Sequence, residues 1–186
     1  MGVGVGLFDF RRQYVSYAAY HVDEKNKAIH TVFVPSILWS SFAMAAYYEP
    51  KIMWAGAIGY AGYYTILHPL IGGSAGVVVL GFAYGAQEFV KHGLEWTGVD
   101  PFVAAAGIWV TSWIAQILGH RIYEGRAPAF LDNAFQPLVL APLFVWTHSL
   151  FDIGLFKKTA NELDVEVTKE VAKYRASKKE GAAAKK

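Results

Sequence analysis

The sequence predicts an all-α fold: a polytopic membrane helical bundle with four spanning helices, one re-entrant or buried helix and an amphipathic C-terminal helix. Two observations lead to this fold class. Of the 186 residues, 54% are hydrophobic and 17% are charged, against roughly 25% charged residues in soluble domains. The charges are also uneven, because the 51 residues from Ile52 to Phe102 contain only Glu88, Lys91, Glu95 and Asp100. We therefore expect a membrane-embedded domain over residues 1–156, followed by a charged tail over residues 157–186.

Five apolar stretches make up the predicted bundle, over residues 29–48, 52–67, 70–86, 101–119 and 134–151. A helix needs about 20 residues to cross a bilayer, and the first and fourth stretches reach this length. The fifth contains Pro137 and Pro142, and proline interrupts helical hydrogen bonding, so this stretch is the best candidate for the re-entrant or buried helix. Lysine and arginine near both ends favour the cytoplasmic side for both, which requires an even number of crossings.

Four crossings would gather most of the histidines. His21, His30, His68 and His120 would share one side of the membrane, and His92 would lie on the opposite side. The topology therefore predicts that residues far apart in the sequence can meet at one end of the bundle.

The tail combines charges of both signs with apolar residues three and four positions apart, at Ala160, Leu163, Val167, Val171 and Tyr174. This spacing is typical of an amphipathic helix, which can lie on the membrane surface, on the protein or against a second copy in a homo-oligomer. From residue 177 onward we expect partial disorder.

Composition excludes several kinds of site. The chain has no cysteine, which leaves histidine and carboxylate as metal ligands and rules out iron–sulfur clusters and thiolate zinc sites. The net charge is only +2 and there is no basic face with interleaved aromatic residues, so nucleic acid is not an expected partner. The sequence has no Walker loop, no Gly-x-Ser-x-Gly elbow and no signal-peptide pattern at its N-terminus.

The strongest candidate site follows the fourth stretch, where His120 and Glu124 are four residues apart and share one helix face. An imidazole and a carboxylate directed at one point are a typical beginning of a metal site, but a histidine here can equally be an interfacial side chain. Arg126 can hold a substrate carboxylate or act as a surface charge. Asp132 can be a further ligand or the cap of the fifth stretch.

Two more histidines flank a polar connector before the first stretch. His21 and His30 are nine residues apart, which matches no short metal signature, but metal sites in helical bundles draw ligands from separate helices. His68 precedes Pro69 and is either an additional ligand or a turn residue. His92 and His148 are expected at the membrane interface.

Several motifs together resemble a known family. They are Tyr20-His21-x4-Asn26-x3-His30-x4-Pro35, Gly119-His120-x3-Glu124-Gly-Arg-Ala-Pro-Ala, Asp132-Asn133 and Leu140-Ala-Pro-Leu-Phe144. Over about residues 7–156 the chain resembles the 2-hydroxy fatty acid dioxygenases, which are small membrane proteins long known only as a domain of unknown function.

The resemblance implies an Fe(II)-dependent alpha-oxidation in the endoplasmic reticulum membrane. A 2-hydroxy long-chain fatty acid and dioxygen would give the fatty acid one carbon shorter during phytosphingosine breakdown. By the same resemblance His21, His30 and His120 would bind the iron. The chemistry of the residues suggests Glu124 as a fourth ligand or an orienting group, and Arg126 as the group that holds the substrate carboxylate. This fits the chemistry, because non-haem iron oxygenases keep open positions beside histidine and carboxylate ligands.

Two other functions remain open from the sequence. A non-enzymatic membrane adaptor or lipid-binding protein would use the histidines only for hydrogen bonds. A metal-dependent lipid hydrolase would keep the ligands but need no oxygen. Metal analysis and the oxygen dependence of turnover separate the three.

Overall fold

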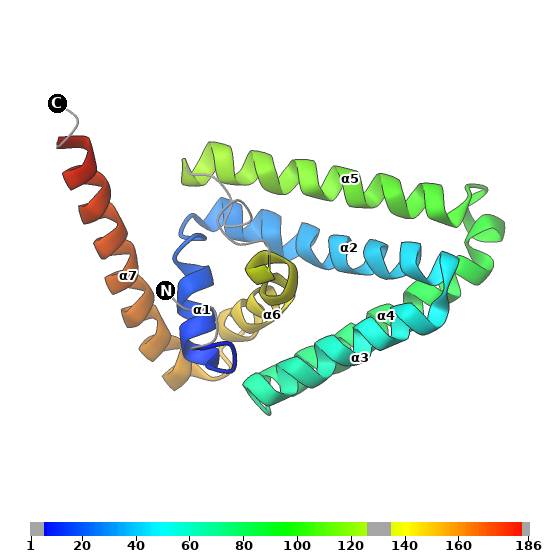
Figure 1. Cartoon of the computed structure of the whole chain (residues 1–186), viewed down its shortest axis with the longest axis horizontal. Coiled ribbons are helices and arrows are strands. Elements are labelled where there is room, and N and C mark those ends of the chain that lie inside the picture. The colour runs from blue at the N-terminus through cyan, green and yellow to red at the C-terminus, as the bar shows by residue number, and fades with distance from the viewer. Residues whose placement is uncertain (1–5, 126–134, 184–186) are drawn as a thin grey trace.

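The computed structural model of the chain describes residues 6–125 and 135–183, and all regular elements in these residues are helical (Figure 1). The prediction of an all-α fold is therefore confirmed for the part of the chain that is described. In chain order the elements are α1 (Phe10–Ala18), α2 (Glu24–Tyr48), α3 (Pro50–Leu67), α4 (Ile71–Thr97), α5 (Pro101–Gly119), the π-helical turn η1 (His120–Glu124), α6 (Phe135–Asp152) and α7 (Lys157–Ala183).

Acidic caps and prolines divide the apolar sequence into separate helices. The carboxylate of Asp23 accepts from two backbone N–H groups at the start of α2, and Asp100 does the same at the start of α5. Pro50 and Pro101 occupy the first positions of α3 and α5, where a missing N–H costs no helical hydrogen bond.

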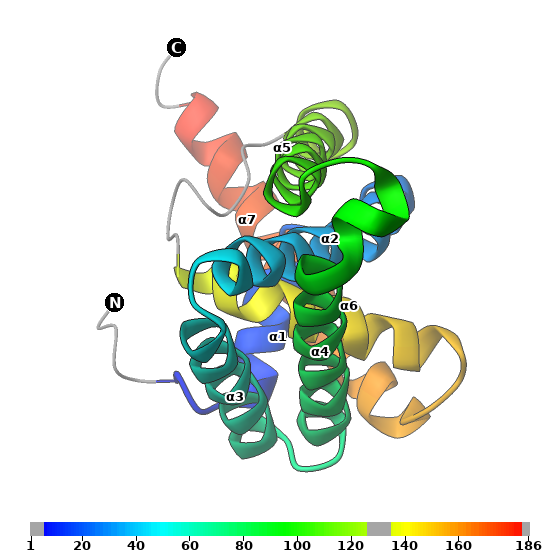
Figure 2. The same ribbon diagram turned by 90° about the vertical axis from the view of Figure 1, so that its right-hand side faces the viewer.

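Helices α2 to α5 run back and forth between the two ends of a bundle (Figure 1). Helices α3 and α4 form an antiparallel hairpin, and α2 packs against both this hairpin and α5 (Figure 2). Because the directions alternate, the start of α2 and the ends of α3 and α5 lie at the same end of the bundle. The turn between α4 and α5 lies at the opposite end.

Helix α6 is largely buried between α1, α2 and α4. Pro142 has no N–H, so the carbonyl of Leu138 loses its partner four residues on. The hydroxyl of Tyr60 in α3 donates to this carbonyl at 2.9 Å. A neighbouring helix thus satisfies the group that the proline leaves open.

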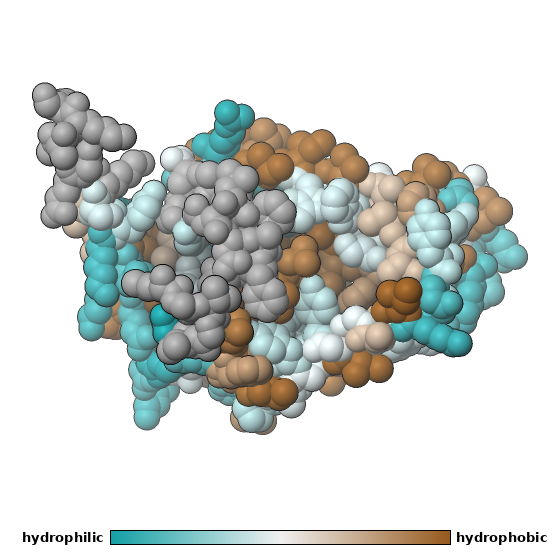
Figure 3. All heavy atoms as spheres, viewed as in Figure 1, coloured by the Kyte–Doolittle hydropathy of each residue, from teal (hydrophilic) through white to brown (hydrophobic). Residues whose placement is uncertain are grey.

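Two segments are long and apolar enough to cross a membrane, Glu24–Tyr48 and Pro101–Glu124, and the pair Leu138–Asp152 and Lys157–Ser177, bent by 120°, would be a third if it forms one span. The sequence predicts four crossings, and the difference lies in α3 and α4. Glycine and tyrosine lower the hydropathy of α3, while Gln87 and Glu88 interrupt the apolar part of α4. Figure 3 shows hydrophobic side chains over α5, with hydrophilic ones gathered at the two ends of the molecule.

The amphipathic helix α7 packs against α1. Leu163 is fully buried, and the Arg11 guanidinium donates to the carboxylates of Glu162 and Glu166 at 2.7 and 2.6 Å. The helix continues past residue 177 to Ala183.

Candidate metal centre

Three buried histidines meet at the end of the bundle where α2 begins and α5 ends. His21 follows α1, His30 lies in α2 and His120 opens η1. Their ring centroids are 4.5 to 4.9 Å apart, one ligand nitrogen from each lies within 4.8 Å of the others, and their residues are only 4%, 1% and 3% exposed. In residues 6–125 and 135–183 this is the one such group of three or more histidines and carboxylates.

Backbone carbonyls orient two of the three rings. Nδ1 of His21 lies 2.9 Å from the Tyr17 carbonyl, and Nδ1 of His30 lies 2.9 Å from the Asn26 carbonyl. Because a carbonyl oxygen can only accept, each Nδ1 carries a proton, and in the neutral ring Nε2 then keeps a lone pair. Both rings are therefore held in the tautomer that binds a metal through Nε2.

A π-helical turn and a glycine place the third ring. His120 is the first residue of η1, and π-helical turns inside α-helices are frequent at functional sites. A Cβ atom on Gly119 would lie 2.8 Å from Oδ1 of Asn26 and 3.2 Å from Cδ1 of Ile29. The glycine thus lets α5 approach α2 closely enough for His120 to meet His30.

Glu124 accepts hydrogen bonds from the segment between His21 and His30. Its Oε1 accepts hydrogen bonds from the backbone N–H of Val22 at 2.8 Å and of Asp23 at 3.0 Å, and from the side-chain amide of Asn26 at 3.0 Å. Its carboxylate is not part of the three-histidine group. Of the two roles that the sequence leaves open, the geometry favours the orienting group over the fourth ligand.

His68 lies at the same end of the bundle but is not one of the three histidines that meet, so its role as an additional ligand stays a prediction. Its ring centroid is 5.0 Å from that of Phe10 and 6.3 Å from that of Phe156. Its Nδ1 accepts from the backbone N–H of Ile71 at 3.2 Å. This bond at the start of α4 is the turn role considered for it from the sequence.

The other sequence candidates lie elsewhere. Arg126 and Asp132 fall outside the described residues. His92 stacks on Trp96 near the end of α4, with ring centroids 5.6 Å apart, and Nε2 of His148 lies 3.5 Å from a carboxylate oxygen of Asp152.

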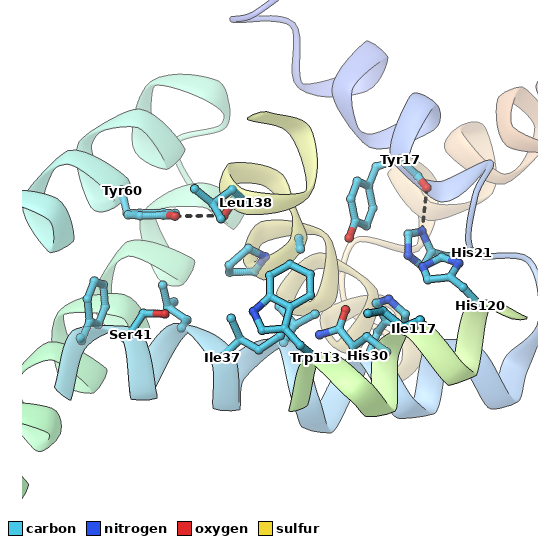
Figure 4. A pocket seen from close by; sticks show the side chains of 16 residues that line it. Tyr17, His21, His30, Ile37, Ser41, Tyr60, Trp113, Ile117, His120 and Leu138 are labelled. Atoms are coloured by element: carbon cyan, nitrogen blue, oxygen red, sulfur yellow. Dashed lines mark hydrogen bonds between the residues drawn. The ribbon is translucent and has the colours of Figure 1, made fainter. Parts of the chain in front are cut away.

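A narrow apolar pocket of about 170 Å³ leads away from the three histidines (Figure 4). Along α2 it extends from His30 to Phe42, about 18 Å at the helical rise of about 1.5 Å per residue. Trp113 of α5 and Leu138 of α6 contribute to its walls, and among residues 6–125 and 135–183 no lysine, arginine, aspartate or glutamate lines it. The pocket suits an alkyl chain whose polar end lies at the histidines.

A second, polar cleft of about 630 Å³ reaches His21 from the side of α7. Glu24 and Lys27 of α2 line it together with Asp164 and Arg175 of α7. His21 thus stands between an apolar pocket and a charged cleft.

Sequence reasoning missed two residues of the pocket wall, Tyr17 and Gln116. The Tyr17 ring stacks on His21 with centroids 4.4 Å apart, and burial raises the pKa of its phenol, so it stays neutral. Gln116 lies one turn before His120. That i, i+4 relation, a polar side chain inside an apolar stretch, was the signal available in the sequence.

Comparison with known proteins gives the same family as the motifs. The model of the family "2-hydroxy-palmitic acid dioxygenase Mpo1-like" matches residues 7–153, a range that contains all three histidines. The chain is 33% identical over 171 residues to the 2-hydroxy-palmitic acid dioxygenase MPO1 of Saccharomyces cerevisiae, covering 89% of this chain and 94% of that protein. No solved structure matches it. The chain therefore belongs to the 2-hydroxy-palmitic acid dioxygenase Mpo1-like family.

Proposed function

We propose that this protein is an Fe(II)-dependent dioxygenase that shortens 2-hydroxy long-chain fatty acids by one carbon. The observation that carries the proposal is the position of three buried imidazoles at the end of a pocket that fits an alkyl chain. The name of the yeast relative supports the substrate class and the use of dioxygen.

The donor set fits iron. Imidazole nitrogens suit iron, zinc, copper and nickel, and a three-histidine set leaves positions for other groups. His21, His30 and His120 would hold the ion. Imidazole ligands carry no negative charge, so they would leave the charge of the ion uncompensated and an anionic substrate would be attracted there. When bound, Fe(II) would supply the activation of dioxygen.

The proposed reaction balances without an added reductant. The bond between C1 and C2 of the 2-hydroxy acid breaks, C2 becomes the new carboxyl carbon and C1 leaves as carbon dioxide. Dioxygen takes up the electrons, and water is the remaining product. The oxygen requirement also separates this activity from hydrolysis.

The surrounding residues would bind, orient and shield the substrate. The apolar pocket would take the acyl chain and exclude water from the head group, and Glu124 would keep the connector of His21 and His30 in place through its three hydrogen bonds. Arg126 is our candidate for holding the carboxylate through two parallel hydrogen bonds. We keep Asp132 as a cap of α6 or a further ligand.

We also propose four crossings of the endoplasmic reticulum membrane, by α2, α3, α4 and α5, with α6 buried between them. In support, α3 and α4 expose Ile58, Ile66 and Val77 by 61%, 66% and 71%, a poor arrangement in water and a suitable one in lipid. The proposed role is the breakdown of 2-hydroxy acids from phytosphingosine.

The test is oxygen consumption by detergent-purified protein loaded with Fe(II) without air. With 2-hydroxypalmitate we expect one dioxygen consumed for each pentadecanoate formed, measured by an oxygen electrode and mass spectrometry. His120→Ala should lose both stoichiometric iron and turnover. Turnover without dioxygen would favour a hydrolase, and the absence of iron binding after anaerobic loading would favour an adaptor; either result would contradict the proposal.

A further inference from the structure

Gln116 stands out among the residues of the pocket that the proposed chemistry has not used. It is 8% exposed, lines the apolar pocket and lies one turn before His120 on α5. Its side-chain Nε2 is fully buried and has no hydrogen-bond partner among the described residues. A buried amide without a partner loses its hydration without compensation, which is costly unless a ligand supplies the missing acceptor.

We propose that Gln116 recognises the 2-hydroxyl group of the substrate and so distinguishes 2-hydroxy acids from plain fatty acids. The inference rests on the proposed function for its substrate class. A primary amide carries both a donor and an acceptor, and so does a hydroxyl group. The two can therefore pair in this pocket, whose described lining beyond the three histidines is mostly aliphatic and aromatic.

The carboxylate is a poorer match for this position. A buried carboxylate needs a cation or several donors, whereas Gln116 is neutral and the described residues that line the pocket include no lysine or arginine. The hydroxyl is neutral and sits on the carbon where the acyl chain begins. An amide in the pocket wall beside the histidines is therefore placed to contact the junction of head group and chain.

Discrimination by such a contact can be large. A site built to hydrogen-bond a hydroxyl rejects the analogue that lacks it, because the buried polar group of the site is then left unpaired. A plain fatty acid would leave the Gln116 amide without a partner. A 2-hydroxy acid would satisfy it.

The test is a cycle of two proteins and two ligands. Wild type and Gln116→Leu are titrated with 2-hydroxypalmitate and palmitate in the absence of oxygen, and metal content is measured for each. We expect Gln116→Leu to bind 2-hydroxypalmitate about tenfold to a hundredfold more weakly, the cost of a lost buried hydrogen bond, with little change for palmitate. Gln116→Met keeps the length of the side chain but cannot form the amide hydrogen bonds, so it should show the same effect as Gln116→Leu.

Ser112→Ala is the matched control. Ser112 is buried on the same helix and does not line the pocket, and its hydroxyl donates to the Ile108 carbonyl within the helix. It should leave the preference between the two acids unchanged. Thermal unfolding checks that each variant is folded.

The outcomes separate the two proposals. Equal weakening of both acids by Gln116→Leu and Gln116→Met would mean that the amide contacts the carboxylate or only shapes the pocket, and would overturn the inference. An unchanged preference would overturn it as well. If wild type prefers 2-hydroxypalmitate through Gln116 but shows no oxygen-dependent turnover, the inference stands and the proposed function fails.

Discussion

At the scale of single residues, Asn26 and Glu124 connect the parts of the candidate metal centre. Asn26 is fully buried; its carbonyl accepts from Nδ1 of His30, and its side-chain amide donates to Glu124. The same carboxylate oxygen of Glu124 also accepts hydrogen bonds from the backbone N–H groups of Val22 and Asp23. Removing this oxygen would leave three donors without their acceptor and free the connector between His21 and His30.

We therefore predict different effects for two substitutions of Glu124. Glu124→Ala should lower metal affinity about tenfold to a hundredfold, the usual effect of losing a group that orients ligands. Glu124→Gln keeps an oxygen acceptor and should retain most of the affinity. Competition titration with a chromophoric chelator measures both. Equal and complete loss in the two variants would mean that the charge itself is required, as for a direct ligand.

The sequence motifs identified the three histidines but did not predict which contacts bring them together. The spacing of His21 and His30 spans a helix end and a connector, so no single periodicity relates them. Glu124 bonds to backbone groups 102 and 101 residues earlier in the chain, and a sequence gives no sign of a contact to a backbone N–H. His68 was predicted on the same side as the other histidines, and its ring packs against Phe10 instead of joining the three-histidine group.

At the scale of helices, the crossing of α2 and α5 decides whether the centre can form. Gly119 of α5 packs tightly against α2, since an added Cβ would meet Oδ1 of Asn26 at 2.8 Å. Asn26 also bonds to Glu124 and orients His30, so it cannot shift without disturbing both.

Gly119→Ala should accordingly destabilise the protein by about 1–3 kcal/mol, as overpacking of a tight interior does, and weaken metal binding. Gly107 on the same helix is the control, since a Cβ there would meet nothing within 4 Å. Gly107→Ala should be neutral or stabilising by up to about 1 kcal/mol, because alanine favours helix. Thermal unfolding with and without metal checks both; equal effects of the two substitutions would contradict the role of the crossing.

The lengths of the apolar stretches and the positions of the prolines predicted most of the helices. They also set apart the fifth stretch, which contains two prolines. They could not predict how Tyr60 would satisfy the carbonyl freed by Pro142, because that partner comes from another helix. The π-helical turn at His120 was also beyond prediction, since its sequence continues an ordinary helical pattern.

At the scale of the whole molecule, the arrangement in the membrane depends on whether the α3–α4 hairpin crosses. The chain has no cysteine, so single cysteines can report on each end. Hydropathy alone marks two or three spans, since it does not register that α3 and α4 pack as a pair.

For four crossings we predict that Lys25→Cys and Leu70→Cys react on one side of sealed vesicles and Glu95→Cys on the other. Two crossings separate residue 25 from residue 70, and a third separates residue 70 from residue 95. A maleimide that cannot cross the membrane, added before and after permeabilisation, measures this. Labelling of Leu70→Cys together with Glu95→Cys would mean that the hairpin stays on one side.

The distance along the chain between the histidines also has a consequence for biosynthesis. His120 lies 90 residues after His30, and domains fold as the chain emerges from its N-terminus. Early in translation the growing polypeptide holds only two of the three imidazoles, and the carboxylate that ties down their connector has not yet been made. Under the proposed function, a site that needs all three imidazoles could bind its ion only after α5 and His120 have been synthesised.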